Sequence, residues 1–474
     1  MKKDRKFKKL IRCIHILVVW AVLTLAWANF WMLNYAYDTV YPFSDMANWF
    51  IVGIYGALLL IFNRFYGGYS LGYYKRGNVI YSSILALIIC NVITFLQASL
   101  IARTFIDIRT FLLMTTAQAV FIIVWTLAAH WFYVVCSSPY KLLMVYNGEK
   151  MADELHQKMA AYPESYVISD SIVVTEELTE AYNKMVHYDG VILCDMPAKQ
   201  RNRLLKFCFE KNIRTYATPN ISDILMRGAK DVTLFDAPLV HNPLGTLTTG
   251  QRFFKRLVDI AFTSIALLTA LPFMLIIAIA IKLGDGGPVL YKQKRLTLGG
   301  KEFNLYKFRS MIVDAEKQTG AQLSTVKDPR ITSVGQFLRA LRLDELPQLI
   351  NILNGDMSIV GPRPERPELA KLHQETMPEF SYRLMVKAGL TGLAQTVGYY
   401  NTAIYDKLRL DLAYIVSYSL LNDFKIMFMT VKVLFLKGST KGVAVKRLPA
   451  VRIGGQENEA DETTLATASS QSRV

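Results

Sequence analysis

The sequence predicts a membrane protein of the α+β class: four N-terminal transmembrane helices, a Rossmann-like α/β cytoplasmic domain, and a C-terminal domain with a re-entrant membrane helix. Three observations predict it. Four long apolar segments come first, short apolar runs then alternate with helical stretches, and a fifth apolar segment carries basic residues on both flanks. We expect domains at residues 1–139, 140–236 and 251–441, a linker at 237–250, and a disordered tail at 442–474, which is polar and low in complexity.

The overall composition supports a membrane location. The chain has 474 residues, of which 52% are hydrophobic, and a formal net charge of +16. Apolar segments that enter lipid, with Lys and Arg at the anionic cytoplasmic surface, explain both values. No nucleic-acid partner is expected, because no compact basic motif with interleaved aromatic residues is present. The five cysteines include no CxxC pair, so neither a disulfide framework nor a zinc site is predicted.

The first four apolar segments are long enough to cross a bilayer, and loop charges give their orientation. The segments run over residues 10–33, 46–62, 79–101 and 111–135. The basic start MKKDRKFKKLIR is expected in the cytoplasm, and the acidic loop YDTVYPFSD outside. Four crossings return the chain to the cytoplasm at Ser137. The first segment lacks a small-residue cleavage site and is interpreted as an anchor rather than a cleavable signal.

Residues 140–236 have the pattern of a small parallel α/β domain. Strand-length runs such as KLLMVYN and DGVILCD alternate with helical stretches such as MADELHQKMAAY. The first turn reads YNGEKMADEL and lacks GxGxxG, so a pyrophosphate-binding turn is not supported. A structural or regulatory role is favoured over dinucleotide binding.

The fifth apolar segment, at about residues 256–282, is predicted to dip into the membrane and return. Basic residues flank both of its ends, which a single crossing would place on opposite sides of the bilayer. Pro272 lies near its middle and removes one backbone hydrogen bond. Thr269 or neighbouring protein could satisfy the freed groups. The alternative is a plain fifth crossing with a tolerated proline.

The densest group of charged residues surrounds an adjacent acid pair, Asp344 and Glu345. Taken alone, the pair could simply cap the following helix. Arg339 and Arg342 lie just upstream, however, and Arg363 lies between two prolines that restrict its backbone. Several fixed guanidinium groups near two carboxylates suit a diphosphate better than an isolated salt bridge.

A second basic group is predicted on a β-hairpin. YKQKRL and EFNLYKFRSM are strand-like and are joined by the turn LGGK, which places Lys307 and Arg309 near the end of the second strand. A solvated basic hairpin and a phosphate site are equally consistent with this segment alone.

Considered together, these stretches resemble the bacterial sugar transferase family, the monotopic phosphoglycosyl transferases that initiate polysaccharide assembly. The resemblance covers roughly residues 251–438, and the N-terminal half resembles the long, polysaccharide-priming branch, the undecaprenyl-phosphate sugar phosphotransferases. The matching stretches are KRLVD, GGPVLYKQKR, YKFRSM, DPRITSVGQFLR, LDELPQLINILNGDMSIVGPRPE and AGLTGLAQ, with the region 411–414.

The resemblance implies roles for individual residues. Asp344 would be the nucleophile, Glu345 would hold Mg²⁺, and Arg363 would bind phosphate, with Lys307, Arg309 and Arg339 as further phosphate contacts. Three positions depart from the usual pattern. Leu271 replaces a serine before the helix-breaking proline, Arg342 replaces a serine before LDELPQ, and Ala388 replaces the proline of the PGxTG turn.

The implied reaction transfers a hexose 1-phosphate from a UDP-sugar to polyprenyl (undecaprenyl) phosphate and releases UMP, which would start exopolysaccharide or capsule assembly. The catalytic domain would face the cytoplasm at the bacterial inner membrane. We expect the N-terminus of the helix after Asp344 to keep this carboxylate ionised. The sugar and the polysaccharide are not determined by the sequence, and a homodimer is plausible only by analogy. The alternatives are a polytopic sugar-phosphate transferase and a non-enzymatic scaffold for polysaccharide export.

Overall fold

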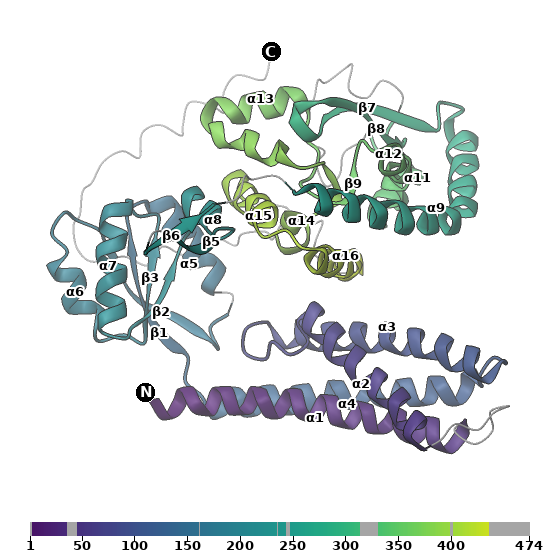
Figure 1. Cartoon of the computed structure of the whole chain (residues 1–474), viewed down its shortest axis with the longest axis horizontal. Helices are drawn as coiled ribbons and strands as arrows, with labels where there is room; N and C mark the ends of the chain where they lie inside the picture. Colours follow the sequence, from purple (N-terminus) through teal and green to yellow (C-terminus); the bar gives the residue numbers. More distant parts are fainter. Residues whose placement is uncertain are drawn as a thin grey trace, which may run out of the picture.

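The computed structural model describes residues 2–35, 45–160, 162–234, 236–242, 247–312, 330–398 and 402–435. The expected disordered tail at 442–474, and all of the expected external loop 37–45 except its last residue, lie outside these ranges. Figure 1 shows three parts: a bundle of long N-terminal helices, an α/β part, and a C-terminal part built mainly of helices and short strands.

The first four apolar segments form long helices, as predicted. Within the described residues, five helices are long and apolar enough to span a membrane: these four and α9. The finding indicates a membrane protein. The bounds of the first four are α1 (Lys2–Asn34), α2 (Asp45–Tyr66), α3 (Arg76–Ala102) and α4 (Ile108–Val135).

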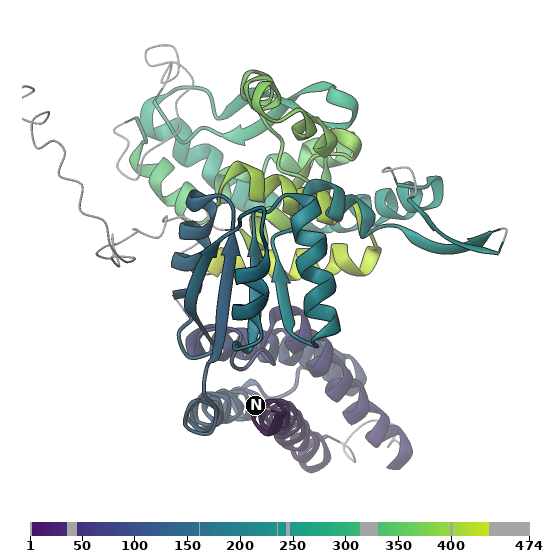
Figure 2. The same cartoon turned by 90° about the vertical axis from the view of Figure 1, so that its left-hand side faces the viewer.

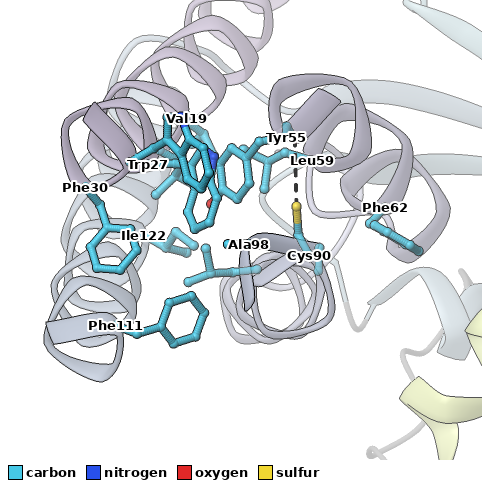
Figure 3. Close-up of a cluster of buried hydrophobic side chains, with 14 of the residues drawn as sticks. Val19, Trp27, Phe30, Tyr55, Leu59, Phe62, Cys90, Ala98, Phe111 and Ile122 are labelled. Atoms are coloured by element: carbon cyan, nitrogen blue, oxygen red, sulfur yellow. Dashed lines mark hydrogen bonds between the residues drawn. The ribbon is translucent and has the colours of Figure 1, made fainter. Parts of the chain in front are cut away.

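Aromatic and aliphatic side chains fill the interior of the bundle. Figure 3 shows Trp27, Tyr55 and Phe111 converging between the helices, and the rings of Trp27 and Tyr55 stack with their centroids 5.0 Å apart. The Cys90 thiol points toward the carbonyl of Tyr55 across a 3.8 Å contact. This packing holds α1, α2, α3 and α4 together.

A buried polar network joins all four helices. The Tyr55 hydroxyl donates to Asn91 Oδ1 at 3.0 Å, and Asn91 Nδ2 donates to Gln118 Oε1 at 2.9 Å. Gln118 in turn donates to the carbonyl of Leu23 at 3.0 Å. Hydrogen bonds between apolar helices fix their register, because an unpaired amide in lipid is costly.

The α/β part contains a four-stranded sheet in the order β2-β1-β3-β4, with every pair parallel. Strand β3 is buried along its whole length, and helices pack against the sheet, as Figure 2 shows. The alternation of strands and helices in the sequence predicted this arrangement. The elements are β1 (Tyr140–Tyr146), α5 (Glu149–Ala160), β2 (Tyr166–Val173), α6 (Thr179–Met185), β3 (Gly190–Cys194), α7 (Ala198–Glu210), β4 (Arg214–Ala217) and α8 (Ile221–Met226).

An antiparallel hairpin follows the sheet and was not predicted. It consists of β5 (Lys230–Leu234) and β6 (Ala237–His241), so residues expected to begin a linker form a strand. In Figure 2 the hairpin projects away from the rest of the molecule.

The fifth apolar segment forms one helix, α9 (Thr249–Asp285), with Pro272 inside it. Figure 1 shows the ribbon of α9 turning sharply along its length. A proline inside a helix has no N–H for the carbonyl four residues earlier, here that of Leu268. The Thr269 hydroxyl donates instead to the carbonyls of Ile265 and Ala266, at 3.1 and 3.0 Å. Of the two partners expected for the freed groups, Thr269 or neighbouring protein, the Thr269 hydroxyl therefore does not bond the Leu268 carbonyl.

The remaining elements form a compact group around α9. Strands β7 and β8 make the predicted antiparallel hairpin, and β9 and β10 make a short parallel pair. The elements are β7 (Leu290–Leu296), η1 (Leu298–Gly300), β8 (Glu302–Phe308), α11 (Ser333–Ala340), η2 (Leu343–Glu345), α12 (Gln348–Asn354), β9 (Ser358–Val360), α13 (Pro367–Thr376), η3 (Pro378–Met385), β10 (Gly389–Thr391), α14 (Leu393–Val397), α15 (Ile404–Val416) and α16 (Leu420–Phe435).

Three charged residues of the KRLVD stretch attach α9 to this group. Lys255 Nζ lies 2.7 Å from Asp423 Oδ2 of α16. The Arg256 guanidinium donates to the carbonyls of Ile352 and Leu353 at 2.6 and 2.7 Å, where α12 ends. Asp259 accepts hydrogen bonds from Ser358 Oγ and the Ile359 N–H, both at 3.0 Å.

We predict that Arg256→Ala destabilises the protein by about 1.5–3 kcal/mol, because two charge-assisted hydrogen bonds at the end of α12 are lost. Thermal unfolding in detergent measures the change. Arg252→Ala is the matched control, since the described side-chain bond of Arg252 is a local one to the Leu247 carbonyl at 2.9 Å. Equal unfolding midpoints for the two variants would contradict this account.

Candidate active site

The acid pair lies in a short 3-10 turn before α12. Asp344 and Glu345 end η2, and α12 begins at Gln348 with Pro347 as its N-cap residue. Asp344 is therefore not the capping residue of this helix. Arg342 precedes the turn with φ 55°, in the left-handed region that non-glycine residues seldom adopt. The backbone thus turns abruptly where the two carboxylates begin.

Asn351 of α12 connects this turn to the hairpin. Its Oδ1 accepts a hydrogen bond from the Tyr306 N–H at 3.0 Å, and its Nδ2 donates to the Asn304 carbonyl at 2.8 Å. Asn351 is fully buried, so both bonds are shielded from water. Strand β8 is thereby held against α12, and its next residue, Lys307, reaches Glu345 with Nζ 3.4 Å from Oε1.

Arg363 approaches Glu345 from the other side. Its Nη2 lies 3.0 Å from Glu345 Oε1, and its side chain is 48% exposed. It therefore pairs with the acid while about half of its side chain stays exposed. The segment Pro362–Pro364 that carries it follows β9, and the Gly361 N–H donates to the Thr391 carbonyl at 2.8 Å.

Buried charges hold the backbone around Arg363. Arg383 Nη2 donates to the Arg363 carbonyl and to Asp411 Oδ2, both at 2.9 Å. Arg295 Nη1 donates to the Pro364 carbonyl at 3.1 Å. Arg383 and Asp411 are both buried. The carbonyls of Arg363 and Pro364 are thus each held by a guanidinium from another element, which limits the positions that Arg363 can adopt.

The electrostatic surroundings separate the two carboxyl groups. Burial alone would raise the pKa of Glu345, but Arg363, Lys307 and Arg342 outweigh it and lower this pKa to about 2. Burial and the neighbouring Glu345 raise the pKa of Asp344, and Lys307 and Arg339 oppose the shift only in part. Helix α12 begins only at Gln348, four residues after Asp344, and the expectation that its N-terminus keeps this carboxylate ionised stays a prediction.

The structure relates three of the four expected phosphate-binding residues to the acid pair. Lys307 and Arg363 contact Glu345, and Arg339 acts on the charge of Asp344. Arg309 is buried, and its guanidinium packs against Gly287, where an added Cβ would collide with it. Its assignment as a phosphate contact stays a prediction.

Sequence reasoning missed the residues that support the site. Arg295, Arg383 and Asn351 were not singled out, because a supporting side chain acts through contacts that only the fold reveals. Asp411 was included only through the family resemblance of the region 411–414. The signal that pointed toward this scaffold was the placement of Arg363 between two prolines.

The residues present are consistent with one divalent cation shared with a substrate. Among the described residues no group of three or more His, Cys, Asp or Glu side chains could hold a metal ion by itself. Mg²⁺ usually takes only one or two protein carboxylates together with substrate phosphates. Glu345 is the carboxylate that would take part, together with the substrate phosphates, and Lys307 and Arg363 already contact its Oε1.

Comparison with known proteins identifies the family. The family described as bacterial sugar transferase matches residues 250–437, the part that contains every element of this site. The chain belongs to the bacterial sugar transferase family. The exopolysaccharide production protein PSS of Rhizobium leguminosarum is 40% identical over 185 residues, which cover 37% of this chain and 92% of that protein.

Two longer relatives match in the same way. The UDP-N-acetylgalactosamine-undecaprenyl-phosphate N-acetylgalactosaminephosphotransferase of Aeromonas hydrophila is 38% identical over 52% of this chain and 59% of its own length. The UDP-glucose:undecaprenyl-phosphate glucose-1-phosphate transferase of Escherichia coli is 39% identical over 44% of each chain. The chain thus spans about half the length of these two relatives.

We predict that Asp411→Asn costs about 3–5 kcal/mol, because Arg383 is left buried with its main counter-charge removed. The double variant Arg383→Met/Asp411→Leu should recover most of that stability, since apolar residues of similar volume replace a buried ion pair well. Its activity should stay low, because the bond to the Arg363 carbonyl is lost. Thermal unfolding and turnover of the same preparations check both parts, and full activity in the double variant would refute the supporting role.

Proposed function

We propose that this protein transfers a sugar 1-phosphate from a UDP-sugar to undecaprenyl phosphate, releases UMP, and so initiates the assembly of an exopolysaccharide or capsule repeat unit. The observation that carries the proposal is the acid pair Asp344–Glu345 enclosed by Lys307 and Arg363 within the family's matched region. The relatives named above include proteins for two different sugars, so the donor is proposed as a class.

The first step uses Asp344 as a nucleophile. One of its carboxylate oxygens attacks the sugar-bearing phosphorus, the anhydride bond to the other phosphorus breaks, and UMP leaves with the electron pair. The product is an aspartyl phosphosugar. The half-exposed guanidinium of Arg363 is the group best placed to pair with the diphosphate, and Lys307 and Arg339 add positive charge nearby.

Glu345 has a different role from its neighbour. Its low pKa keeps it ionised, and its contacts with Lys307 and Arg363 hold both cations in place. When bound through Glu345 and the substrate phosphates, Mg²⁺ would supply positive charge to the leaving group. The environments of the two adjacent carboxyl groups shift their pKa values in opposite directions, which is consistent with two different roles.

The second step transfers the phosphosugar to lipid. A phosphate oxygen of the polyprenyl phosphate attacks the phosphorus, the bond to Asp344 breaks, and the carboxylate is restored. We propose that α9 is re-entrant and returns at Pro272, so that the site lies at the cytoplasmic face, where UDP-sugars are present. The Rossmann-like part at 140–236 is proposed to be structural or regulatory.

The nucleophile assignment predicts that Asp344→Asn lowers transfer by roughly 10³-fold or more and abolishes covalent labelling by a radiolabelled UDP-sugar. Labelling is measured in detergent without an acceptor, with UDP-N-acetylgalactosamine and UDP-glucose as donors. Asp231→Asn, at an exposed position of β5, is the matched control and should label normally. Undiminished label on the Asp344→Asn variant would end the assignment, and a chain that never releases UMP would favour the scaffold alternative.

The raised pKa of Asp344 predicts that the labelling rate, plotted against pH, falls measurably on the acid side. The nucleophile must be ionised, so the labelling rate should fall as the pH drops through a pKa above the usual value of an aspartate. Arg339 lowers this pKa, so Arg339→Gln should move the acid limb to higher pH, whereas Arg339→Lys should leave it nearly in place. The pH dependence of single-turnover labelling gives the result, and an unmoved limb in Arg339→Gln would show that Arg339 does not act on Asp344.

A further inference from the structure

The orientation of α11 is fixed by its packing on α9. Leu338 is buried with Ile277 and Ile281 of α9, and Val334, one turn earlier, packs against the same cluster. Gly335 faces the backbone of Ser310 so closely that an added Cβ would collide with it. The side of α11 that faces inward is therefore determined.

The flank of α11 next to this inward side is apolar as well. Phe337 is 61% exposed and Leu341, which caps the helix, is 51% exposed. Positions four residues apart lie on the same face of a helix, so these two side chains are neighbours. A solvated helix normally presents polar residues there, and two large apolar side chains indicate contact with an apolar partner.

The stretch of α9 that contacts α11 also carries exposed apolar side chains. Ile276, Ile279 and Leu283 are 64%, 59% and 82% exposed, on the same stretch of α9 that carries the inward contacts of α11. Because α9 is one of the helices apolar enough to enter a membrane, this flank of α11 lies beside a surface suited to lipid.

Positive charge and the nucleophile come directly after the apolar pair. Arg339 lies between Phe337 and Leu341 in the sequence, Arg342 follows, and η2 then presents Asp344. The Arg342 N–H bonds to the Arg339 carbonyl at 3.3 Å, so the two arginines belong to one tight turn. An exposed apolar pair followed in the chain by a turn with two arginines matches a molecule with a long hydrocarbon chain and a phosphate head.

We propose that Phe337 and Leu341 bind the prenyl chain of the acceptor and thereby deliver its phosphate, between Arg339 and Arg342, to the phosphosugar on Asp344. The inference rests on the proposed function and adds the acceptor site to it. In the step served, a phosphate oxygen of the acceptor forms a bond to the phosphorus of the aspartyl phosphosugar as the bond from phosphorus to Asp344 breaks, which restores the carboxylate.

The test compares acceptors of two chain lengths with the full-length protein in detergent. The double variant Phe337→Ser/Leu341→Ser is measured against Phe209→Ser/Val186→Ser, whose apolar side chains are 89% and 48% exposed in the α/β part. For each protein, kcat/KM is determined with undecaprenyl phosphate and with a short polyprenyl phosphate of a few isoprene units. Labelling by the UDP-sugar without acceptor is measured in parallel.

We expect the Phe337/Leu341 variant to lose about tenfold in kcat/KM for the long acceptor, while its use of the short acceptor and its labelling stay within about twofold of wild type. The control variant should keep the wild-type preference for the long chain. If the Phe337/Leu341 variant keeps that preference, the face contacts bulk membrane lipid instead and the inference is overturned. If the wild-type protein takes no label, the proposed covalent mechanism is contradicted. If labelling is normal and only the preference for the long chain is unchanged in the Phe337/Leu341 variant, the covalent mechanism stands and only the acceptor site is overturned.

Discussion

The site depends on one carboxylate that two cations share. Glu345 Oε1 contacts Nζ of Lys307, 38 positions earlier, and Nη2 of Arg363, 18 positions later. Burial opposes a charge at each of these places, since it lowers the pKa of Lys307 and works against ionisation of Glu345. Each charge is tolerated because the others are present. Removing Glu345 would leave Lys307, whose side chain is only 20% exposed, beside Arg363 without the acid between them.

The same grouping explains how two adjacent carboxyl groups differ. The cations contact Glu345, so its charge is favoured, and the resulting anion then raises the pKa of Asp344. Asp344 is therefore the less stabilised anion of the two. For the nucleophilic role proposed for Asp344 this is useful, because a carboxylate held by strong ion pairs would have to lose them before it could attack.

The parts of the fold that follow local patterns were predictable, and those that depend on distant contacts were not. Apolar length identified the first four helices, and alternating runs identified the parallel sheet. The hairpin of β7 and β8 followed from its LGGK turn. The β5–β6 hairpin was not predicted, because residues 237–241 contain a proline and precede a region without a clear pattern.

In the site, the charges of Asp344, Glu345 and Arg363 could be recognised from their spacing. Asn351 and Arg383 could not, because an amide or a guanidinium that supports a backbone has no sequence signature of its own.

The KRLVD stretch shows why the catalytic groups and the membrane helix cannot be treated as separate units. Lys255, Arg256 and Asp259 lie within little more than one turn of α9 and bind α16, the end of α12 and β9, respectively. Helix α12 directly follows the acid pair, and β9 leads into the segment that carries Arg363. Because these contacts fix one end of α9, a shift of this helix would move both the acid pair and the segment that carries Arg363. The depth at which α9 enters the membrane would therefore determine how far Asp344 stands from the lipid surface, and the proposed transfer from a soluble donor to a lipid acceptor requires that depth to be held constant.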